Sequence, residues 1–369
     1  SVPGQFLQIT SGTGATGYTY DNATQVNKNH VINGDFGIWQ RGIGLTGISG
    51  HTGTKQTFFA DRWARVCQTG TTGSRTYAFE LKRGNFSKKQ QDVEGYPDHY
   101  AIIKGDITYG GGTHTNEFYK VEQRFEDVTS FAGNIMTCSF YAKGSVAGTC
   151  HLAWIQNYDG KTGAPAGHTL GTPNYPYGVT ANEKWTSISN IALGTTWSRY
   201  AYSFFVPDVS SAAGASGTNF AINSGSTQDH FASLSFFTQL TSLPDGEAKN
   251  IDYAGQLSLA NVKLERGNIS TPFNRVEKGE ELLKCQRFYQ TSYEYGSYRG
   301  SNTMNNRLPD TSGVKFIVPS TFSHFEPFRV RMRTTPTVEV FSPSGVLNEG
   351  FNYDAGDNLK NTAGTRGAA

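Results

Sequence analysis

Charge, cysteine and long apolar runs are all scarce in this chain of 369 residues. Charged side chains make up 17% of it and the net charge is only +2, whereas ordinary globular chains carry about 25% charged residues. We therefore exclude the dense basic surface of a nucleic-acid-binding protein and a strong attraction to anionic membranes. No apolar stretch approaches the roughly 18 residues that predict a membrane-spanning helix. The opening SVPGQFLQIT has no basic region followed by an apolar one, so we expect no secretory signal there.

Motifs for metals and for the commonest enzymes are also missing. The four cysteines are too few for a disulfide scaffold, and no CxxC pair predicts zinc. The eight histidines show no metal-ligand spacing. No GxSxG elbow, HExxH helix or P-loop is present. These absences favour a non-catalytic protein.

Glycine and aromatic residues, in contrast, are abundant, with 43 Gly, 24 Phe, 19 Tyr and 5 Trp. Aromatic side chains bury a large area each and can build a sizeable core despite the low hydrophobic fraction of 36%. The length corresponds to roughly two to three domains. The composition favours an all-β, aromatic-rich protein.

Alternation of period two marks the middle of the chain as strands. The clearest segments are 118–127, 136–143 and 149–158, in which apolar residues alternate with polar ones. Further strand candidates lie between clusters of Gly, Pro, Asn and Ser, at 101–107, 199–206, 231–239 and 256–265. Strands at this spacing, without long helical patterns, predict an antiparallel jelly-roll β-sandwich.

Two of these segments invite a more specific prediction. A short turn around 144–148 would join 136–143 and 149–158 as a β-hairpin. A turn centred at Gly144 would then place Cys138 opposite Cys150. We expect both thiols to be free and buried, with a disulfide as the alternative.

The two ends of the chain differ from this middle. Residues 1–29 are polar and rich in Gly and Thr, which predicts a connector. We expect 30–274 to form the sandwich. In 275–369 we expect a short helix at about 278–290, with Glu280 and Glu281 near its positive N-terminus, and then a smaller β module. The strands predicted for that module are 314–319, 328–332 and 337–341. Because 364–369 supplies no closing strand, we expect the chain to be a fragment of a longer polypeptide.

Three islands of sequence together resemble the distal part of bacteriophage tail-fibre and related appendage proteins. They are NGDFGIWQRG (33–42) with ADRW (60–63), LANVKLERG (259–267) with TPF (271–273), and GEELLKCQRFY (279–289) with RTTPTV (333–338). The leading GQFLQI (4–9) with GTGA (12–15) is similar to the short repeats of trimeric phage fibres. The NGDF…W and LANVKLE motifs also look like the first and last strands of jelly-roll carbohydrate-binding modules.

This resemblance implies a virion protein that presents a sugar-binding sandwich, commonly as a homotrimer. It would be assembled in the host cytoplasm beside other virion proteins and would act on a glycan at the host surface, with no nucleic-acid or membrane partner. We expect no cofactor and no metal. Jelly-roll sugar modules often hold a structural Ca²⁺, but here only Asp35 fits, because Asn261 stands where an acidic ligand would be expected.

Sugar binding needs flat aromatic faces beside polar groups that meet the sugar hydroxyls. The outward-reading face of the central strands would be such a platform if those strands adjoin in one sheet, an ordinary polar face being the alternative. Two tyrosines flank a proline in the loop 174–178, and two of the five tryptophans lie near Gly- and Asn-rich loops; Trp39, Trp63 and Trp154 are expected in the core. The candidate binding residues are Arg124, Tyr141, His151, Tyr175, Tyr177, Trp185, Trp197 and Arg199.

Two other functions remain open beside a non-catalytic glycan receptor. One is a purely architectural virion component, either a capsid decoration or a fibre joint. The other is a polysaccharide depolymerase, which needs two carboxylates roughly 5–10 Å apart. Glu122 and Glu126 share one face of a strand, but four residues place them about 13 Å apart with Arg124 between them. We therefore expect solvated surface charges at these positions.

Overall fold

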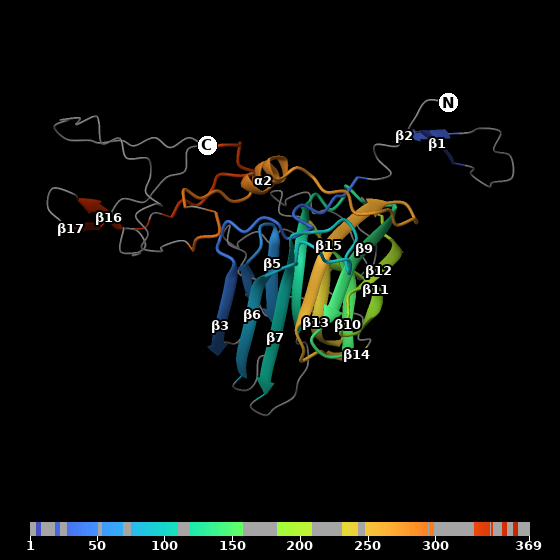
Figure 1. The fold of residues 1–369 in the computed structure, drawn as a ribbon, viewed down its shortest axis with the longest axis horizontal. Coiled ribbons are helices and arrows are strands. Elements are labelled where there is room, and N and C mark those ends of the chain that lie inside the picture. The colour runs from blue at the N-terminus through green and yellow to red at the C-terminus, as the bar shows by residue number, and fades with distance from the viewer. Residues whose placement is uncertain are drawn as a thin grey trace, which may run out of the picture.

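The computed structural model describes residues 5–8, 19–22, 28–50, 54–68, 75–109, 118–157, 183–208, 231–242, 248–293, 295–298, 328–339, 341, 349–352 and 357–360. Two antiparallel sheets face each other as a β-sandwich (Figure 1). The first sheet has the order β12 (Ser198–Phe205), β9 (Ile135–Gly144), β15 (Leu257–Arg266), β7 (His99–Tyr109), β6 (Arg75–Asn85) and β3 (Gly44–Gly50). The second sheet has the order β11 (Glu183–Leu193), β10 (Gly148–Asn157), β13 (Phe231–Ser242), β8 (Phe118–Glu126), β5 (Trp63–Gln68) and β4 (Thr54–Phe58), and β14 (Ala248–Asp252) pairs with β13. The predicted all-β sandwich is confirmed.

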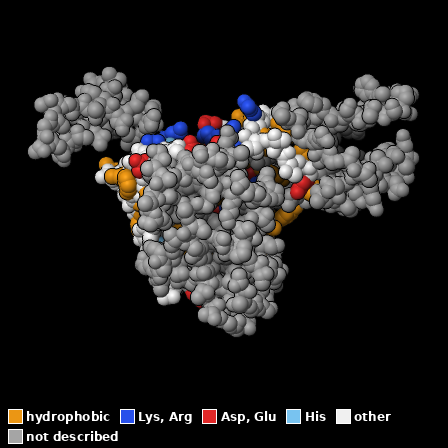
Figure 2. Space-filling model, turned by 180° about the vertical axis from the view of Figure 1, so that it is seen from behind, with side chains coloured by type: hydrophobic (Ala, Val, Ile, Leu, Met, Phe, Trp, Pro, Cys, Tyr) orange, Lys and Arg blue, Asp and Glu red, His pale blue; other side chains and the backbone are white. Residues whose placement is uncertain are grey.

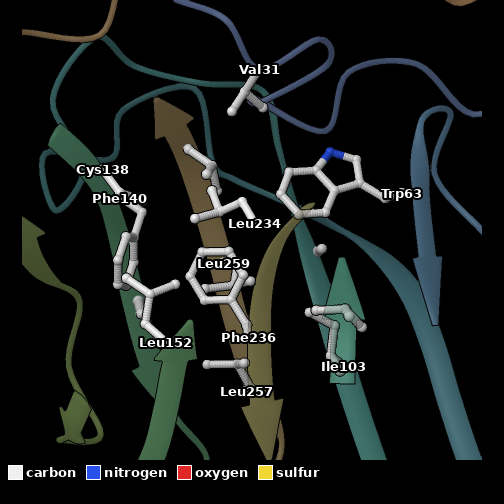
Figure 3. Close-up of a cluster of buried hydrophobic side chains, with 14 of the residues drawn as sticks. Val31, Trp63, Ile103, Cys138, Phe140, Leu152, Leu234, Phe236, Leu257 and Leu259 are labelled. Atoms are coloured by element: carbon white, nitrogen blue, oxygen red, sulfur yellow. The ribbon is translucent and has the colours of Figure 1, made fainter. Parts of the chain in front are cut away.

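Alternating apolar residues of both sheets meet in one aromatic core. Trp39, Trp63 and Trp154 are fully buried, as the sequence predicted. Figure 3 shows the centre of this core, where Phe140 of the first sheet reaches Phe236 of the second. Their rings pack edge to face with centroids 5.0 Å apart, a favourable arrangement of aromatic quadrupoles.

The predicted hairpin at 144–148 is wrong. Strand β9 pairs with β12 and β15, whereas β10 pairs with β11 and β13, so the chain crosses from one sheet to the other at this corner. The Tyr253 hydroxyl donates to the Val146 carbonyl at 2.9 Å and lies so close that a Cβ at Gly144 would overlap it. Cys138 and Cys150 consequently belong to facing sheets, and both are free and buried.

The charged face of β8 is also different from the prediction, because Lys120 and Glu122 are each only 1% exposed. Lys120 Nζ and Arg124 Nε both lie 2.7 Å from the Glu122 carboxylate. Lys120 Nζ also lies 5.5, 5.6 and 5.5 Å from the ring centres of Phe118, Phe237 and Trp185. The expected solvated face is thus a second, buried layer of aromatic and charged side chains on the outer side of the second sheet.

Helix α2 (Lys278–Gln286) lies across one end of the sandwich (Figure 1). It begins where predicted and ends four residues earlier than the expected 290. Glu280 and Glu281 occupy its first turn, while Cys285 and Gln286 are buried. Among the residues that the structure describes, no helix is long and apolar enough to cross a membrane.

Asn33 connects this helix to the sandwich. Its side chain accepts from the Ile38 amide at 2.8 Å and donates to the carbonyls of Ile38 and Asp61, both at 2.9 Å. Its own amide donates to the Glu281 carboxylate of α2, and its carbonyl accepts from the Trp63 indole at 3.0 Å. Asn33 is fully buried and has a φ of +58°, which Asn tolerates better than most residues.

Short hairpins lie near both ends of the chain. β1 (Gln5–Gln8) pairs with β2 (Thr19–Asn22) inside the predicted connector, and β16 (Glu349–Asn352) pairs with β17 (Asp357–Lys360). Two strands predicted for the C-terminal module are wrong: 328–332 is irregular, and in the second, 337–341, residues 337–339 are irregular and Phe341 makes a single β-bridge. The third predicted strand, 314–319, lies outside the described residues.

Replacement of Asn33 tests its role in folding. We expect Asn33→Ala to lower the free energy of unfolding by about 3 kcal/mol or more, because two carbonyls and one amide lose their buried partner. Urea denaturation measures this loss. Asn268→Ala, at an exposed position, is the control and should change stability by about 0.5 kcal/mol or less. Equal stabilities for the two variants would contradict this role.

The buried charges of β8 predict an acid dependence of stability. Burial by itself would raise the pKa of Glu122, but the charges of Lys120 and Arg124 outweigh burial and hold this pKa at about 2. A folded pKa below the unfolded value contributes stability above about pH 4.5, which is lost as the pH falls towards 2. We expect Glu122→Gln to lower the free energy of unfolding by about 3 kcal/mol or more at pH 7. Between pH 4.5 and 2, the stability of this variant should fall less than that of the wild type. Urea denaturation midpoints of the wild type and of Glu122→Gln, measured at several pH values, test this prediction. Glu94→Gln, at an exposed position, is the control.

Candidate functional site

The predicted binding residues do not form one platform, because they belong to different sheets. Arg124, His151 and Trp185 lie on the outer side of the second sheet, whereas Tyr141 and Arg199 lie on the outer side of the first. Trp197 immediately precedes β12 of the first sheet. Tyr175 and Tyr177 lie outside the described residues.

The residues on the second sheet are committed to contacts within the protein. His151 is 1% exposed, and its two ring nitrogens lie 2.7 Å from Asn190 Oδ1 and 3.3 Å from Ser187 Oγ. Arg124 stacks over the Phe231 ring at 4.4 Å. Trp185 packs against Phe237, with ring centroids 5.4 Å apart. His151 is therefore buried within the fold, whereas Arg124 and Trp185 are partly exposed and pack against neighbouring aromatic rings.

The first sheet carries a cluster of aromatic rings on its outer side. Phe86, Tyr100 and Trp197 are mutually in contact, with ring centroids 4.7, 5.2 and 5.3 Å apart, and all three are partly exposed. Sequence reasoning missed Phe86 and Tyr100. The alternation of β7 contains the signal for Tyr100, since Ala101 and Ile103 point into the core and Tyr100 must therefore point outward.

The centre of this outer face consists of small side chains. Leu257 and Leu259 of β15 point into the core, so Ser258 and Ala260 face outward. Ser258 pairs with Lys143 of β9, and Ala260 pairs with Tyr141. Ser258 and Ala260 are both buried, at 7% and 0% exposure, so larger neighbouring side chains cover the middle of this face.

Polar groups of several kinds surround the aromatic rings. Lys143 Nζ lies 5.2 Å from the Trp197 ring centre, and the Tyr141 hydroxyl lies 3.4 Å from the Glu94 carboxylate. Arg199 is exposed and donates to the Thr271 carbonyl at 3.3 Å. Partial burial raises the pKa of the Tyr141 hydroxyl above its ordinary value. We call this surface the aromatic platform; it consists of Phe86, Glu94, Tyr100, Tyr141, Lys143, Trp197 and Arg199.

Asn261 holds one edge of the platform in place. Its φ of +49° interrupts the regular pairing of β15 with β9, and its side-chain amide donates to the Glu94 carbonyl at 2.8 Å. Asp35, the other residue considered for calcium, accepts from the Gly37 amide and faces Arg275. In the part of the chain that the structure describes, no three His, Cys, Asp or Glu side chains gather as a metal site.

The two carboxylates weighed for a depolymerase are both engaged with cations. Glu122 is bound to Lys120 and Arg124, and Glu126 lies 3.2 and 3.0 Å from Arg287 and Arg333. Arg124 therefore pairs with Glu122 and leaves Glu126 to residues of the C-terminal region. Both side chains serve contacts within the fold.

No protein-family model matches the chain, and no curated protein matches it. Solved structures with a similar fold include the enzymatically active domain of tailspike protein 4 of bacteriophage CBA120, at 14% identity and a TM-score of 0.29 over 65% of this chain and 21% of that chain. They also include a family 11 carbohydrate-binding module from Clostridium thermocellum, at 14% identity and a TM-score of 0.29 over 60% of this chain and 99% of that one. The CBM22-1 xylan-binding domain from Paenibacillus barcinonensis is 8% identical, with a TM-score of 0.29 over 67% of this chain and 99% of that one. What the chain shares with them is a distant likeness of the β-sandwich.

Partial exposure of the platform predicts that its rings can be removed without unfolding the protein. We expect Trp197→Ala to lower the free energy of unfolding by about 1 kcal/mol, because only part of the ring is buried. Trp63→Ala should lower the free energy of unfolding by about 3–5 kcal/mol, because it leaves a cavity in the core. Urea denaturation of both variants measures the difference. An equally large loss in Trp197→Ala would show that Trp197 is a core residue.

Proposed function

We propose that the chain is a non-catalytic, glycan-binding part of a bacteriophage fibre or appendage, and that the aromatic platform contacts the sugar. The observation that carries this proposal is a cluster of three partly exposed aromatic rings beside cationic, anionic and phenolic groups. A surface of this composition matches the two sides of a pyranose, which has an apolar C–H face and a rim of hydroxyls.

Each group of the platform has a role in this interaction. The rings of Trp197 and Tyr100 would stack on the apolar sugar face, while Lys143 and Arg199 would donate to hydroxyl or ring oxygens. Glu94 would accept from hydroxyls, and the Tyr141 hydroxyl beside it can do either. Because all of these side chains except Glu94 lie on or next to paired strands, few conformations are lost on binding.

The open shape of the platform determines how strongly one copy can bind. A solvent-exposed surface buries little of the sugar, so we expect weak binding at a single site. Several copies on one fibre would raise the overall affinity through their effective concentration, without any new contact. The resemblance of the sequence islands to phage appendages supports this arrangement, with a homotrimer in the virion that acts at the host surface.

Binding to host cells tests the proposal. The purified protein, with its oligomeric state established by sedimentation, should bind cells before but not after their surface polysaccharide is stripped. Trp197→Ala and Arg199→Ala should each weaken binding about fivefold or more, the effect of losing an important contact at an interface. Leu283→Ala, which removes an exposed side chain of α2, is the matched control and should bind like the wild type.

Two results would contradict the proposal. If the folded oligomer does not bind cells that carry their polysaccharide, an architectural virion role becomes the better account. If purified polysaccharide is cleaved and new reducing ends appear, the protein is a depolymerase.

A further inference from the structure

The turn that carries Asn33 contains a chemically reactive dipeptide. Asn33–Gly34 is the only Asn-Gly pair in the 369 residues of the chain. An asparagine side chain loses its amide fastest when glycine follows it, because glycine has no Cβ to hinder the approach of its own backbone nitrogen to that side chain. The chemistry of this pair does not depend on any contact with a glycan.

The reaction needs only water as a second reactant. The backbone nitrogen of Gly34 attacks Cγ of Asn33, the bond from Cγ to Nδ2 breaks, and Nδ2 leaves as ammonia with the proton that the Gly34 amide gives up. Water then opens the resulting succinimide ring at either of its carbonyls. Opening at the side-chain carbonyl gives an aspartate. Opening at the backbone carbonyl gives an isoaspartate, whose main chain is longer by a methylene group.

The folded protein holds both residues in a way that blocks the first step. Both N–H donors of the Asn33 side chain bond to the carbonyls of Ile38 and Asp61, and its oxygen accepts from the Ile38 amide. The Gly34 carbonyl accepts from the Val262 amide at 2.8 Å, so the Gly34 peptide is fixed to β15. The nitrogen of Gly34 therefore cannot move onto the side chain before Asn gives up its buried partners.

Water is also excluded from this pair. Charged side chains, blue and red in Figure 2, lie along the upper end of the molecule, the end that α2 crosses in Figure 1. Asn33 bonds through its backbone amide to Glu281 of that helix and is 0% exposed, and Gly34 is buried as well. The reactive pair therefore lies beneath the surface of the folded protein, whereas unfolding exposes it completely.

Neither product of the reaction fits the native site. An aspartate carboxylate has no N–H to donate and would bring a negative charge against the carbonyl oxygens of Ile38 and Asp61. The carboxylate of Glu281, bonded to the Asn33 amide, adds the repulsion of a like charge. An isoaspartate would lengthen the main chain where Gly34 already approaches β15 too closely for any Cβ. A modified chain thus loses the bonds that join the sequence islands.

We propose that Asn33–Gly34 is a deamidation site that the fold seals and that unfolding opens. A chain that stays unfolded converts its amide and then cannot return to the native state. Unfolding becomes irreversible with time, so the rate of unfolding determines how long the protein survives. The pair also removes chains that remain unfolded from the population that is able to fold.

Timed unfolding tests the proposal. The protein is held in guanidinium chloride at a mildly alkaline or a mildly acid pH, with a thiol reductant for its four free cysteines, and is diluted into native buffer at intervals. Peptide mass spectrometry measures the fraction of chains that keep the Asn33 amide, and tryptophan fluorescence measures the fraction that refolds. Because the Gly34 nitrogen must lose its proton, we expect both fractions to fall together at alkaline pH and to stay high at acid pH.

The native protein, kept at the same two pH values without denaturant, should retain its Asn33 amide throughout. Three results would overturn the proposal. The first is full refolding by chains whose amide is gone. The second is loss of the amide in the native protein as fast as in guanidinium chloride. The third is a refolded fraction that falls while the amide remains, which would assign the irreversibility to aggregation.

A pair of variants tests the product directly and does not depend on refolding. Asn33→Asp encodes one product of the reaction, and we expect either no native protein or a urea midpoint at least as low as that of Asn33→Ala. Asn268→Asp makes the same chemical change at an exposed position and should keep the midpoint of the wild type. A native Asn33→Asp protein with the wild-type midpoint would refute the claim that deamidated chains cannot fold.

Discussion

The hydrogen bonds of Asn33 are the constraint on which the rest of the molecule depends. The buried side chain of Asn33 connects the turn 33–38 to the segment before β5, and its backbone amide bonds to Glu281 of helix α2. The next residue, Gly34, accepts from the Val262 amide of β15 at 2.8 Å and approaches that strand too closely for any Cβ. The three sequence islands therefore meet at one place in the fold.

The two outer faces of the sandwich differ in how much of their charge is buried. On the second sheet, Glu122 lies between Lys120 and Arg124, so its charge can be buried beneath an aromatic layer at a tolerable cost. On the first sheet, Lys263 and Glu265 form a similar buried pair that bonds to residues 271–272, whereas Lys143 and Arg199 remain near solvent. The first sheet therefore presents aromatic and charged groups together at a surface, where a polar ligand can reach them.

Several features follow from the sequence with little ambiguity, and others do not. The alternation in 118–127 predicted β8, and the two acidic residues before an apolar stripe predicted the start of α2. The hairpin at 144–148 was wrong because alternation identifies a strand but not its neighbour. The platform was only half predicted: Tyr141, Trp197 and Arg199 were named, but Phe86, which follows β6, and Tyr100 of β7 lie far away in the chain.

The sequence by itself determined that the protein is all-β and that Trp39, Trp63 and Trp154 are buried, because period-two patterns and large apolar rings act locally. Only the tertiary structure decided which polar residues face solvent. Lys120 and Lys143 occupy equivalent outward positions in their strands, yet the first is buried and the second is partly exposed. The difference arises from what packs over each sheet, and those contacts join residues far apart in the chain.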